Sequence, residues 1–391
     1  MKKVRLGIIG LGSMGAAHAQ WILAGKTPRI ELAAVADTDP AVRKPFAHIR
    51  SFADGSDLIK SGCVDAVLIA TPHYSHTTLG IQTLKAGLHL LVEKPISVHK
   101  ADCLRLIAAA KAAQRGGKRV VFAAMFNQRT NLHYRKLREL LQSGELGEVQ
   151  RIQWTITNWF RAQSYYSSGG WRATWAGEGG GMLLNQCPHN LDMFQWLFGM
   201  PDRVTAFCEF GCYHAIEVED SVTAYLEYKN GPTATFIAAT GEAPGTNRLE
   251  IACDRGRIVL ENGKIEFIRT EVPVGEFCRT SPARWSIPDV WNVQIPVAGE
   301  GTQHIGILNN FADAVLDGAA LIAPAEEGIH SVELANAMLL STFDRKAIEL
   351  PLNAARYEKA LKKKIADSKF KKRVVKAAPM KRDLDNSFGK F

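Results

Sequence analysis

The sequence has no apolar run close to the ~20 residues that a membrane-spanning helix needs. It also has no Cys-x-x-Cys pair, and Cys208 and Cys212 have no His or Cys beside them at the spacing of a zinc site. Seven scattered cysteines predict free thiols in a reducing compartment, with neither a disulfide framework nor a metal site. We therefore expect a soluble cytoplasmic protein that contacts no membrane.

The body of the chain has no excess of charge of either sign. The whole sequence carries 48 Lys and Arg against 39 Asp and Glu, but 13 of these basic residues and 4 of the acidic ones lie in residues 356–391. Residues 1–355 therefore carry 35 of each sign. Because a folded body that binds nucleic acid normally has its own basic surface, no nucleic-acid partner is expected.

Residues 1–125 contain short, continuous apolar runs that alternate with helix-compatible stretches. Strands alternating with helices predict a parallel sheet with right-handed connections, and continuously apolar strands predict a sheet covered on both faces. The expected first domain is therefore an α/β Rossmann domain with a doubly wound parallel sheet. Its expected strands are Val4–Gly10, Glu31–Ala36, Val64–Ala70, Leu88–Val92 and Val120–Met125.

Residues 126–355 follow a different pattern. Val149–Asn158 and Val222–Tyr228 alternate between apolar and polar residues, which is typical of a sheet with one exposed face. Turn residues then predict three successive hairpins, at Asn230-Gly231, Asp254-Arg255-Gly256 and Asn262-Gly263. The expected second domain is α+β with a large, mostly antiparallel open sheet. Its expected helices are Asn190–Phe198, His304–Asp317 and Gly328–Glu349.

The segment Gly10-Leu11-Gly12-Ser13-Met14-Gly15 follows the first expected strand and opens a helix. The three glycines allow a tight turn, close approach of the backbone to a pyrophosphate, and close packing of helix on strand. The helix N-terminus, at Ser13 and Met14, offers N–H donors to the phosphates. This pattern predicts a dinucleotide-binding site.

Asp37 ends the second expected strand, 22 residues after Gly15. An acidic side chain at this position accepts hydrogen bonds from the ribose hydroxyls of the adenosine. Its carboxylate would repel a 2′-phosphate, and Thr38 rather than an arginine follows it. The sequence therefore favours NAD over NADP as cofactor.

With these residues in place, the chain resembles the glucose–fructose oxidoreductase / inositol dehydrogenase (Gfo/Idh/MocA) family of NAD(P)-dependent sugar and cyclitol oxidoreductases. The resemblance covers nearly all of residues 1–352. Its motifs are GIIGLGSMG (7–15), ATPHYSH (70–76), AGLHLLVEKP (86–95), NQR (127–129), GELGEV (144–149) and GGGMLLNQCPHNLD (179–192). The Glu-Lys-Pro and Gly-rich–His segments are the most specific of these.

The resemblance implies that Lys94 binds the substrate hydroxyl that is oxidised, at the carboxyl end of the expected strand Leu88–Val92. An ammonium group beside the reacting oxygen would stabilise a developing alkoxide. Glu93 would pair with Lys94 or position it, and both residues would also border the cofactor.

The resemblance matches His189 to the catalytic histidine of the family. This role suits its chemistry, because imidazole titrates near neutral pH and can take up the hydroxyl proton. Asn185 stands where the family usually has Asp. Asn can hydrogen-bond the substrate but cannot accept a proton, so Lys94 and His189 become the main catalytic pair. Asp192 could either orient the imidazole or cap a helix.

The resemblance also implies less specific contacts on both sides of the site. Residues expected near the cofactor are Thr71, Pro72, His73, His76 and Asn127, although His76 also suits a helix start. The substrate set adds four residues, Arg129, Tyr165, Trp171 and Arg172, to Lys94, Asn185 and His189. Loop packing is an equally good interpretation of Tyr165, Trp171 and Arg172.

The leading interpretation is an NAD-dependent dehydrogenase of a sugar, sugar derivative or cyclitol. The alternatives are a non-catalytic regulator that senses NAD and sugar, and an enzyme that uses a transient keto-sugar for elimination or hydrolysis. The second-domain sheet has helices for one face only, which predicts a homodimer or homotetramer through the other face. A basic tail, 356–391, is expected as a solvated extension or an arm on another subunit.

Overall fold

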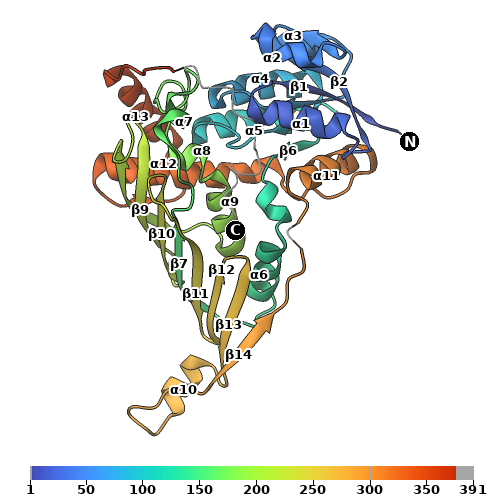
Figure 1. The fold of residues 1–391 in the computed structure, drawn as a ribbon. Coiled ribbons are helices and arrows are strands. Elements are labelled where there is room, and N and C mark those ends of the chain that lie inside the picture. The colour runs from blue at the N-terminus through green and yellow to red at the C-terminus, as the bar shows by residue number, and fades with distance from the viewer. Residues whose placement is uncertain (1, 118, 300, 376–391) are drawn as a thin grey trace.

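The computed structural model describes residues 2–117, 119–299 and 301–375, and it contains two sheets (Figure 1). The first sheet has six parallel strands in the order β3-β2-β1-β4-β5-β6. They are β1 (Val4–Ile9), β2 (Ile30–Ala36), β3 (Arg50–Phe52), β4 (Ala66–Ile69), β5 (His89–Val92) and β6 (Phe122–Ala124). The strand order reverses between β1 and β4, so the predicted doubly wound Rossmann fold is confirmed.

The five expected strands of this sheet form close to their predicted bounds because each is a buried apolar run. Every residue of β4, for example, is buried. The sequence did not predict β3, an edge strand of three residues without an apolar run. Helices cross between the strands, as the alternating pattern requires. They are α1 (Ser13–Leu23), α2 (Pro40–Arg43), α3 (Gly55–Lys60), α4 (His73–Ala86) and α5 (Lys100–Arg115).

The second sheet has nine strands in the order β14-β13-β12-β11-β7-β10-β9-β8-β15. All neighbouring strands run antiparallel except β7 and β10, which are parallel. Its first five strands are β7 (Val149–Ile156), β8 (Arg203–Phe210), β9 (Glu219–Glu227), β10 (Thr233–Ala239) and β11 (Asn247–Cys253). The others are β12 (Gly256–Glu261), β13 (Lys264–Thr270), β14 (Val290–Ile295) and β15 (Ile348–Glu349).

The three predicted hairpins are confirmed: they join β9 to β10, β11 to β12 and β12 to β13. Their turns contain residues in the left-handed region, with φ of 59° at Asn230, 125° at Gly256 and 50° at Asn262. Asn and Gly are the residues that adopt this conformation with least strain. The turn chemistry therefore explains the order of these strands.

Helices pack on one face of this sheet, and the other face is exposed (Figure 1). Along β9, Val222, Ala224 and Leu226 are buried and Tyr225 is exposed. Phe236 of the neighbouring strand pairs with Ala224 and is fully buried. The helices on this side are α6 (Leu132–Gln142), α7 (Gln163–Ser167), α8 (Met182–Asn185) and α9 (Pro188–Phe198).

Helix α12 (Gly328–Asp344) lies between the two sheets and packs on β8, α9 and α5. Buried residues occupy nearly its whole circumference, as expected of a helix enclosed on all sides. The predicted helix 328–349 is too long. Helix α12 ends at Asp344, because Arg345 adopts a left-handed conformation with φ of 51°, and Ile348 and Glu349 then form β15.

Residues 303–332 lie inside the second expected domain, but they pack against the first sheet. Phe311 of α11 (Gln303–Asp317) belongs to the core of the parallel sheet, and the Ala124 N–H donates to the Ala323 carbonyl at 3.0 Å. The short helices η2 (Asn127–Thr130) and η3 (Ala325–Glu327) border the same region. The two parts of the molecule are therefore joined by packing as well as by the chain.

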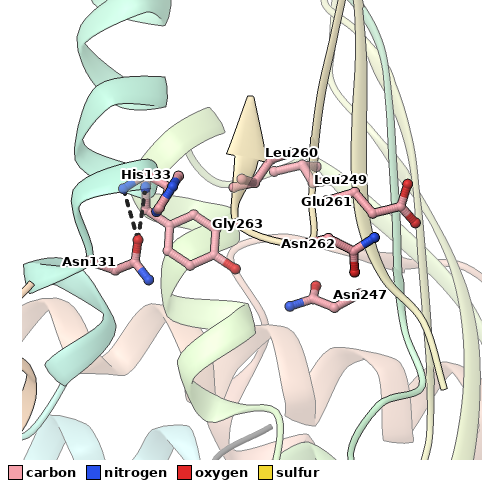
Figure 2. A pocket seen from close by; sticks show the side chains of 9 residues that line it. Asn131, His133, Asn247, Leu249, Leu260, Glu261, Asn262 and Gly263 are labelled. Carbon is pink, nitrogen blue, oxygen red and sulfur yellow. Dashed lines mark hydrogen bonds between the residues drawn. The ribbon is translucent and has the colours of Figure 1, made fainter. Parts of the chain in front are cut away.

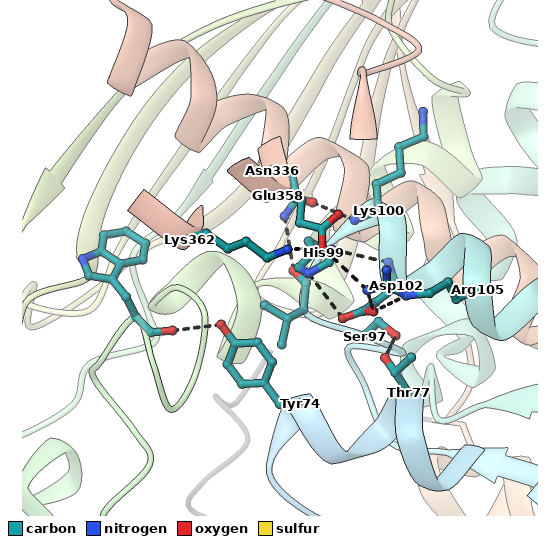
Figure 3. Close-up of polar contacts among 12 residues, drawn as sticks. Tyr74, Thr77, Ser97, His99, Lys100, Asp102, Arg105, Asn336, Glu358 and Lys362 are labelled. Carbon is teal, nitrogen blue, oxygen red and sulfur yellow. Dashed lines mark hydrogen bonds and ion pairs between the residues drawn. The ribbon is translucent and has the colours of Figure 1, made fainter. Parts of the chain in front are cut away.

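The expectation of a solvated extension is wrong for the described part of the C-terminal tail. Helix α13 (Ala354–Asp367) buries Tyr357 and Leu361 and packs on α5 and α12. Figure 3 shows polar contacts of this helix. The Glu358 carboxylate accepts a hydrogen bond from the Lys362 ammonium at 2.9 Å and lies 3.9 Å from the Arg105 guanidinium. The sequence pattern was misleading because the lysines of this helix cover a narrow apolar stripe. Residues 376–391 lie outside the described residues.

No helix among the described residues combines enough length and apolar character to cross a membrane. All seven cysteines carry free thiols. In the described ranges, no group of three or more His, Cys, Asp and Glu side chains is arranged to hold a metal ion.

Candidate functional site

The glycine loop between β1 and α1 is built so that only glycines fit two of its positions. A Cβ at Gly10, where φ is 92°, would lie 2.6 Å from the Ala70 carbonyl oxygen, and one at Gly15 would lie 1.8 Å from the Gly10 carbonyl oxygen. A Cβ at Gly12 would meet nothing within 4 Å. The backbone at Gly12 therefore borders open space at the start of α1.

The predicted ribose-binding residue lies beside this loop. Asp37 follows β2, and its carboxylate accepts the Leu11 N–H at 2.7 Å and the Asp39 N–H at 2.9 Å. These bonds fix the carboxylate next to the glycine loop while it stays partly exposed.

These residues fit a dinucleotide. No side chain caps the N-terminus of α1, so its first N–H groups remain available to a pyrophosphate that approaches over Gly12. The carboxylate of Asp37 lies at the end of the neighbouring strand, where the adenosine ribose binds in doubly wound sheets.

The residues after β4 have different surroundings from one another. The buried hydroxyl of Thr71 has no partner among the described residues, and Pro72 directly precedes α4. The His76 ring contacts the carbonyls of Pro95 at 2.8 Å and Thr71 at 2.9 Å. Because both ring nitrogens are occupied, His76 holds these two loops together rather than presenting its ring to the cofactor. His73 lies against the Trp171 ring, with centroids 5.0 Å apart.

Lys94 and Glu93 close β5, and each side chain points to a different partner. Glu93 contacts His18 of α1 at 2.7 Å and accepts the Lys94 backbone N–H at 3.2 Å. The Lys94 ammonium donates to the Asn185 carbonyl at 2.8 Å. Glu93 therefore positions the Lys94 backbone, while the ammonium reaches across to the segment that carries the candidate histidine.

Burial and nearby cations change the ionisation of this pair. Burial lowers the pKa of Lys94, Glu93 opposes the change, and Arg161 and Arg172 add to it. For Glu93, burial acts against ionisation, but the hydrogen bond and charge of His18 outweigh it and lower the pKa to about 2. Glu93 is therefore ionised throughout the neutral range.

His189 lies in the first turn of α9, almost completely buried. Burial lowers its pKa well below the usual value, and the charge of Lys94 and the neighbouring His304 lower it further. Neither ring nitrogen has a hydrogen-bond partner among the described residues. The imidazole is therefore uncharged at neutral pH and can accept a proton.

Asn185 is held in a polar network on the substrate side. Its Oδ1 accepts the Tyr165 hydroxyl at 3.1 Å, and its Nδ2 donates to the buried carboxyl of Glu178. The same carboxyl accepts the Ala173 N–H at 2.7 Å. Burial raises the pKa of Glu178 to about 7, although these hydrogen bonds partly oppose the change.

The structure corrects the expectations for Arg129 and Asp192. The Arg129 guanidinium forms two hydrogen bonds to the Asp192 carboxylate, at 2.7 and 2.8 Å, and also pairs with Glu327 at 2.5 Å. Arg129 is thus part of an internal ion pair rather than the expected substrate set, and Asp192 neither orients His189 nor caps a helix. Asn127 bonds Gln303 at 2.8 Å and leaves its own oxygen without a partner among the described residues.

The aromatic loop, residues 161–175, places its cations above its rings. The Arg172 guanidinium lies 5.0 Å from the Tyr165 ring centroid and 4.6 Å from that of Trp171. Arg161 lies 5.4 Å from the same Tyr165 ring. Since Tyr165 is bonded to Asn185, this loop and Lys94 border one site.

Sequence reasoning missed four residues of the site: His18, Glu178, His304 and Lys372. His18 and His304 stack edge-on, with centroids 5.8 Å apart, and burial together with His18 lowers the pKa of His304 to about 3. Only Glu178, directly before the triple glycine, had a local sequence signal. The others reach the site from elements more than 70 residues away from Lys94 along the chain.

The pocket in Figure 2 lies apart from Lys94, between α6 and the hairpins of the second sheet. Its polar lining includes Asn131, His133 and Asn247. A smaller cavity is also lined by Asn247, and its lining includes His189. Neither cavity is lined by Lys94.

Two family models match the chain. The model described as "Oxidoreductase family, NAD-binding Rossmann fold" matches residues 4–120, and the "GFO/IDH/MocA C-terminal domain" model matches residues 134–259. Together they cover more than half of the sequence and include Lys94 and His189. They confirm the resemblance that the motifs indicated.

Curated relatives and solved structures agree with these matches. Inositol 2-dehydrogenase of Rhizobium meliloti (strain 1021) is 26% identical over 361 residues, covering 89% of this chain and 99% of the relative. The 1-carboxy-3-chloro-3,4-dihydroxycyclohexa-1,5-diene dehydrogenase of Comamonas testosteroni is 30% identical over 241 residues, 59% of this chain and 56% of the relative. The WlbA dehydrogenase from Chromobacterium violaceum, crystallised with NADH and UDP-GlcNAcA, is 26% identical with a TM-score of 0.76 over 90% of this chain and 97% of its own.

Proposed function

Because this chain belongs to the Gfo/Idh/MocA family of oxidoreductases, we propose that it transfers a hydride between NAD and a carbinol carbon of a sugar, sugar derivative or cyclitol. One observation carries the proposal: the Lys94 ammonium is fixed at the Asn185 carbonyl, in a buried site that also holds an uncharged His189 without a partner among the described residues. An acid and a base are thus available for one hydroxyl group.

The glycine loop and Asp37 would hold the cofactor. The N–H groups at the start of α1 would bind the pyrophosphate, and Asp37 would accept hydrogen bonds from the adenosine ribose. When bound, NAD supplies the hydride acceptor. Asn127 and Thr71, with buried oxygens that have no partner among the described residues, offer further polar contacts at the carboxyl ends of the strands.

Lys94 and His189 would act on the substrate hydroxyl. The ammonium of Lys94 would orient this hydroxyl and stabilise the negative charge that develops on its oxygen. The neutral imidazole of His189 would take up the hydroxyl proton. Asn185 would position Lys94 through its backbone carbonyl and Tyr165 through its Oδ1, without itself exchanging a proton. A regulator that senses NAD without turnover is disfavoured because both candidate catalytic side chains are present.

The test is turnover by the purified full-length chain with NAD and a panel of sugars, sugar acids and inositols, followed by NADH absorbance. Lys94→Met should lower the rate on the best substrate by about 10²–10³, because one charge-stabilising donor is lost, while NADH still binds. Lys60→Met, at the exposed end of α3, is the matched control and should leave the rate unchanged. Turnover above about a tenth of the wild-type rate in Lys94→Met would contradict the assignment.

We include a homo-oligomer in this proposal. The outer face of the second sheet exposes Phe207, with 71% of its surface accessible, and Tyr225, with 43%. Large exposed apolar side chains on an uncovered sheet mark a contact surface. The chain should be a dimer or tetramer by light scattering at micromolar concentration, and Phe207→Glu should weaken the assembly. A wild-type monomer would refute this part. Seven free thiols support a cytoplasmic location.

A further inference from the structure

Positive charge gathers on the substrate side of the site. The Arg172 guanidinium lies over the rings of Tyr165 and Trp171, and the Arg161 guanidinium lies 5.4 Å from the Tyr165 centroid. The Tyr165 hydroxyl reaches Asn185, whose carbonyl holds Lys94. One aromatic ring therefore places two guanidinium groups beside the catalytic ammonium.

The C-terminal segment 368–375 adds a fourth cation. The Lys372 ammonium donates to the Arg172 carbonyl at 2.8 Å, and the Val375 N–H donates to the Ser167 carbonyl at 3.1 Å. Ser368 bonds the carboxylate of Glu217, which also accepts an N–H of the aromatic loop. These contacts fasten the segment along the loop and bring Lys372 next to Arg172.

The carboxylates near these cations are already occupied. The two oxygens of Glu178 accept hydrogen bonds from Asn185 and from the Ala173 backbone. Glu93 is engaged by His18 and by the Lys94 backbone. Among the described residues at this site, side-chain donors with positive charge therefore outnumber carboxylate acceptors that could face a substrate.

This imbalance determines what kind of substrate fits. A hydroxyl group donates as well as accepts, and guanidinium and ammonium groups offer donors only. The buried Nε of Arg172 has no partner among the described residues, and a buried donor left in this state costs free energy. A carboxylate or phosphate supplies several acceptor atoms and negative charge, which match a guanidinium group in geometry.

We propose that Arg172, with Lys372 and Arg161 beside it, forms an anion-binding subsite, so that the substrate is an anionic sugar or cyclitol such as a sugar acid. The inference rests on the proposed dehydrogenase function and adds the class of substrate. The negative group lies on the substituent that faces the aromatic loop, and the hydroxyl to be oxidised lies at Lys94.

The experiment compares matched substrates on the full-length chain with NAD. Each set keeps one ring stereochemistry and changes one substituent: glucose, glucuronate and glucose 6-phosphate, with the galactose series beside it. At least one anion should have a kcat/KM about tenfold or more above that of its neutral counterpart. This factor corresponds to a difference in activation free energy of ~1.4 kcal/mol. Its KM should rise with ionic strength, because salt screens charge. The uronate and phosphate arms distinguish the two kinds of anion.

Variants locate the subsite. Arg172→Gln should reduce the anion-to-neutral ratio of kcat/KM to near one, and Arg172→Lys should restore it only in part, because lysine keeps the charge but lacks the planar fork. Lys372→Gln should lower the ratio less. Lys371→Gln, one residue away and exposed, is the matched control and should leave the ratio unchanged. Thermal midpoints verify that each variant is folded.

Binding separates failure of this inference from failure of the proposed function. The NADH-bound protein is titrated with each sugar while cofactor fluorescence is followed. Tighter binding of an anion that Arg172→Gln abolishes supports the subsite, even if no sugar is turned over and the dehydrogenase proposal fails. Equal or better binding and turnover of the neutral sugars overturn the anion subsite and leave the dehydrogenase proposal standing.

Discussion

The two halves of the site are constructed differently. The cofactor half lies within residues 10–37 and consists of one strand, a glycine loop, one helix and the end of the next strand. The substrate half is assembled from Lys94, the loop and helices of 165–189, and Lys372. In the proposed function, the first half would bind its ligand with backbone groups and Asp37 in a local motif, and the second with side chains brought together by tertiary packing.

The halves also differ in how they treat charge. Asp37 is partly exposed and its carboxylate is held by two backbone N–H groups. In the substrate half, burial lowers the pKa of Lys94, raises that of Glu178 and lowers that of His189. Groups with shifted pKa values that gather in one place are typical of a catalytic site, whereas a dinucleotide needs only a fixed surface.

The largest effect is expected at the ion pair that joins Arg129 of η2 to Asp192 of α9, with each side chain 1% exposed. Asp192→Ala should lower the free energy of unfolding by about 3–5 kcal/mol, because it leaves a buried guanidinium poorly paired. Glu327→Gln removes the 43%-exposed partner and should cost less than about 1 kcal/mol. Chemical denaturation measures both. Similar losses in the two variants would show that burial does not decide the strength of these pairs.

The next effect concerns Glu178, whose pKa rises to about 7 in the folded protein from an ordinary value of 4.5. The folded state therefore holds the proton of the Glu178 carboxyl more tightly than the unfolded state does. The stability that this proton contributes is complete below pH 4.5 and is lost as pH rises through about 7. Relative to Glu178→Gln, the wild-type protein should lose on the order of 3 kcal/mol over this range. Unfolding free energies from pH 4.5 to pH 8 test this. Parallel curves for the two proteins would refute it.

In the cofactor half, Gly12→Ala should fold normally yet bind NADH about tenfold or more weakly, ~1.4 kcal/mol. The backbone at Gly12 has φ of −62°, which alanine adopts readily, and the new methyl group would enter the space left for the pyrophosphate. Gly170→Ala is the control, because its Cβ also meets nothing within 4 Å but lies in the aromatic loop. Fluorescence titration should show loss of affinity in Gly12→Ala alone.

The smallest effect is the choice between cofactors. The wild-type protein should bind NADH about tenfold more tightly than NADPH, since the Asp37 carboxylate repels a 2′-phosphate. Asp37→Ala should weaken binding of both cofactors, because Leu11 and Asp39 lose their acceptor, and should bring the two affinities close together. The ratio of the affinities is therefore the measurement. A ratio that stays near ten in Asp37→Ala would assign the preference to another residue.

Much of the fold could be predicted because its signals are local. Apolar runs indicated five of the six parallel strands, and Asn-Gly and Asp-x-Gly turns indicated the hairpins. The errors fall where no local signal exists. The exposed edge strand β3 has no apolar run, and α12 ends at Arg345 rather than at Glu349 because a left-handed residue begins a short strand.

The cofactor half could be predicted from the sequence alone, since Gly10, Gly12, Gly15 and Asp37 lie within one strand–loop–helix–strand unit whose geometry follows from residue type. Its motifs also singled out Lys94 and His189 as candidate catalytic residues. Only the tertiary structure decided that Arg129 pairs with Asp192 and that Lys372 joins Arg172. Such contacts join positions 63 and 200 residues apart. Partners at these separations are chosen by packing of whole elements, which no local pattern of residues encodes.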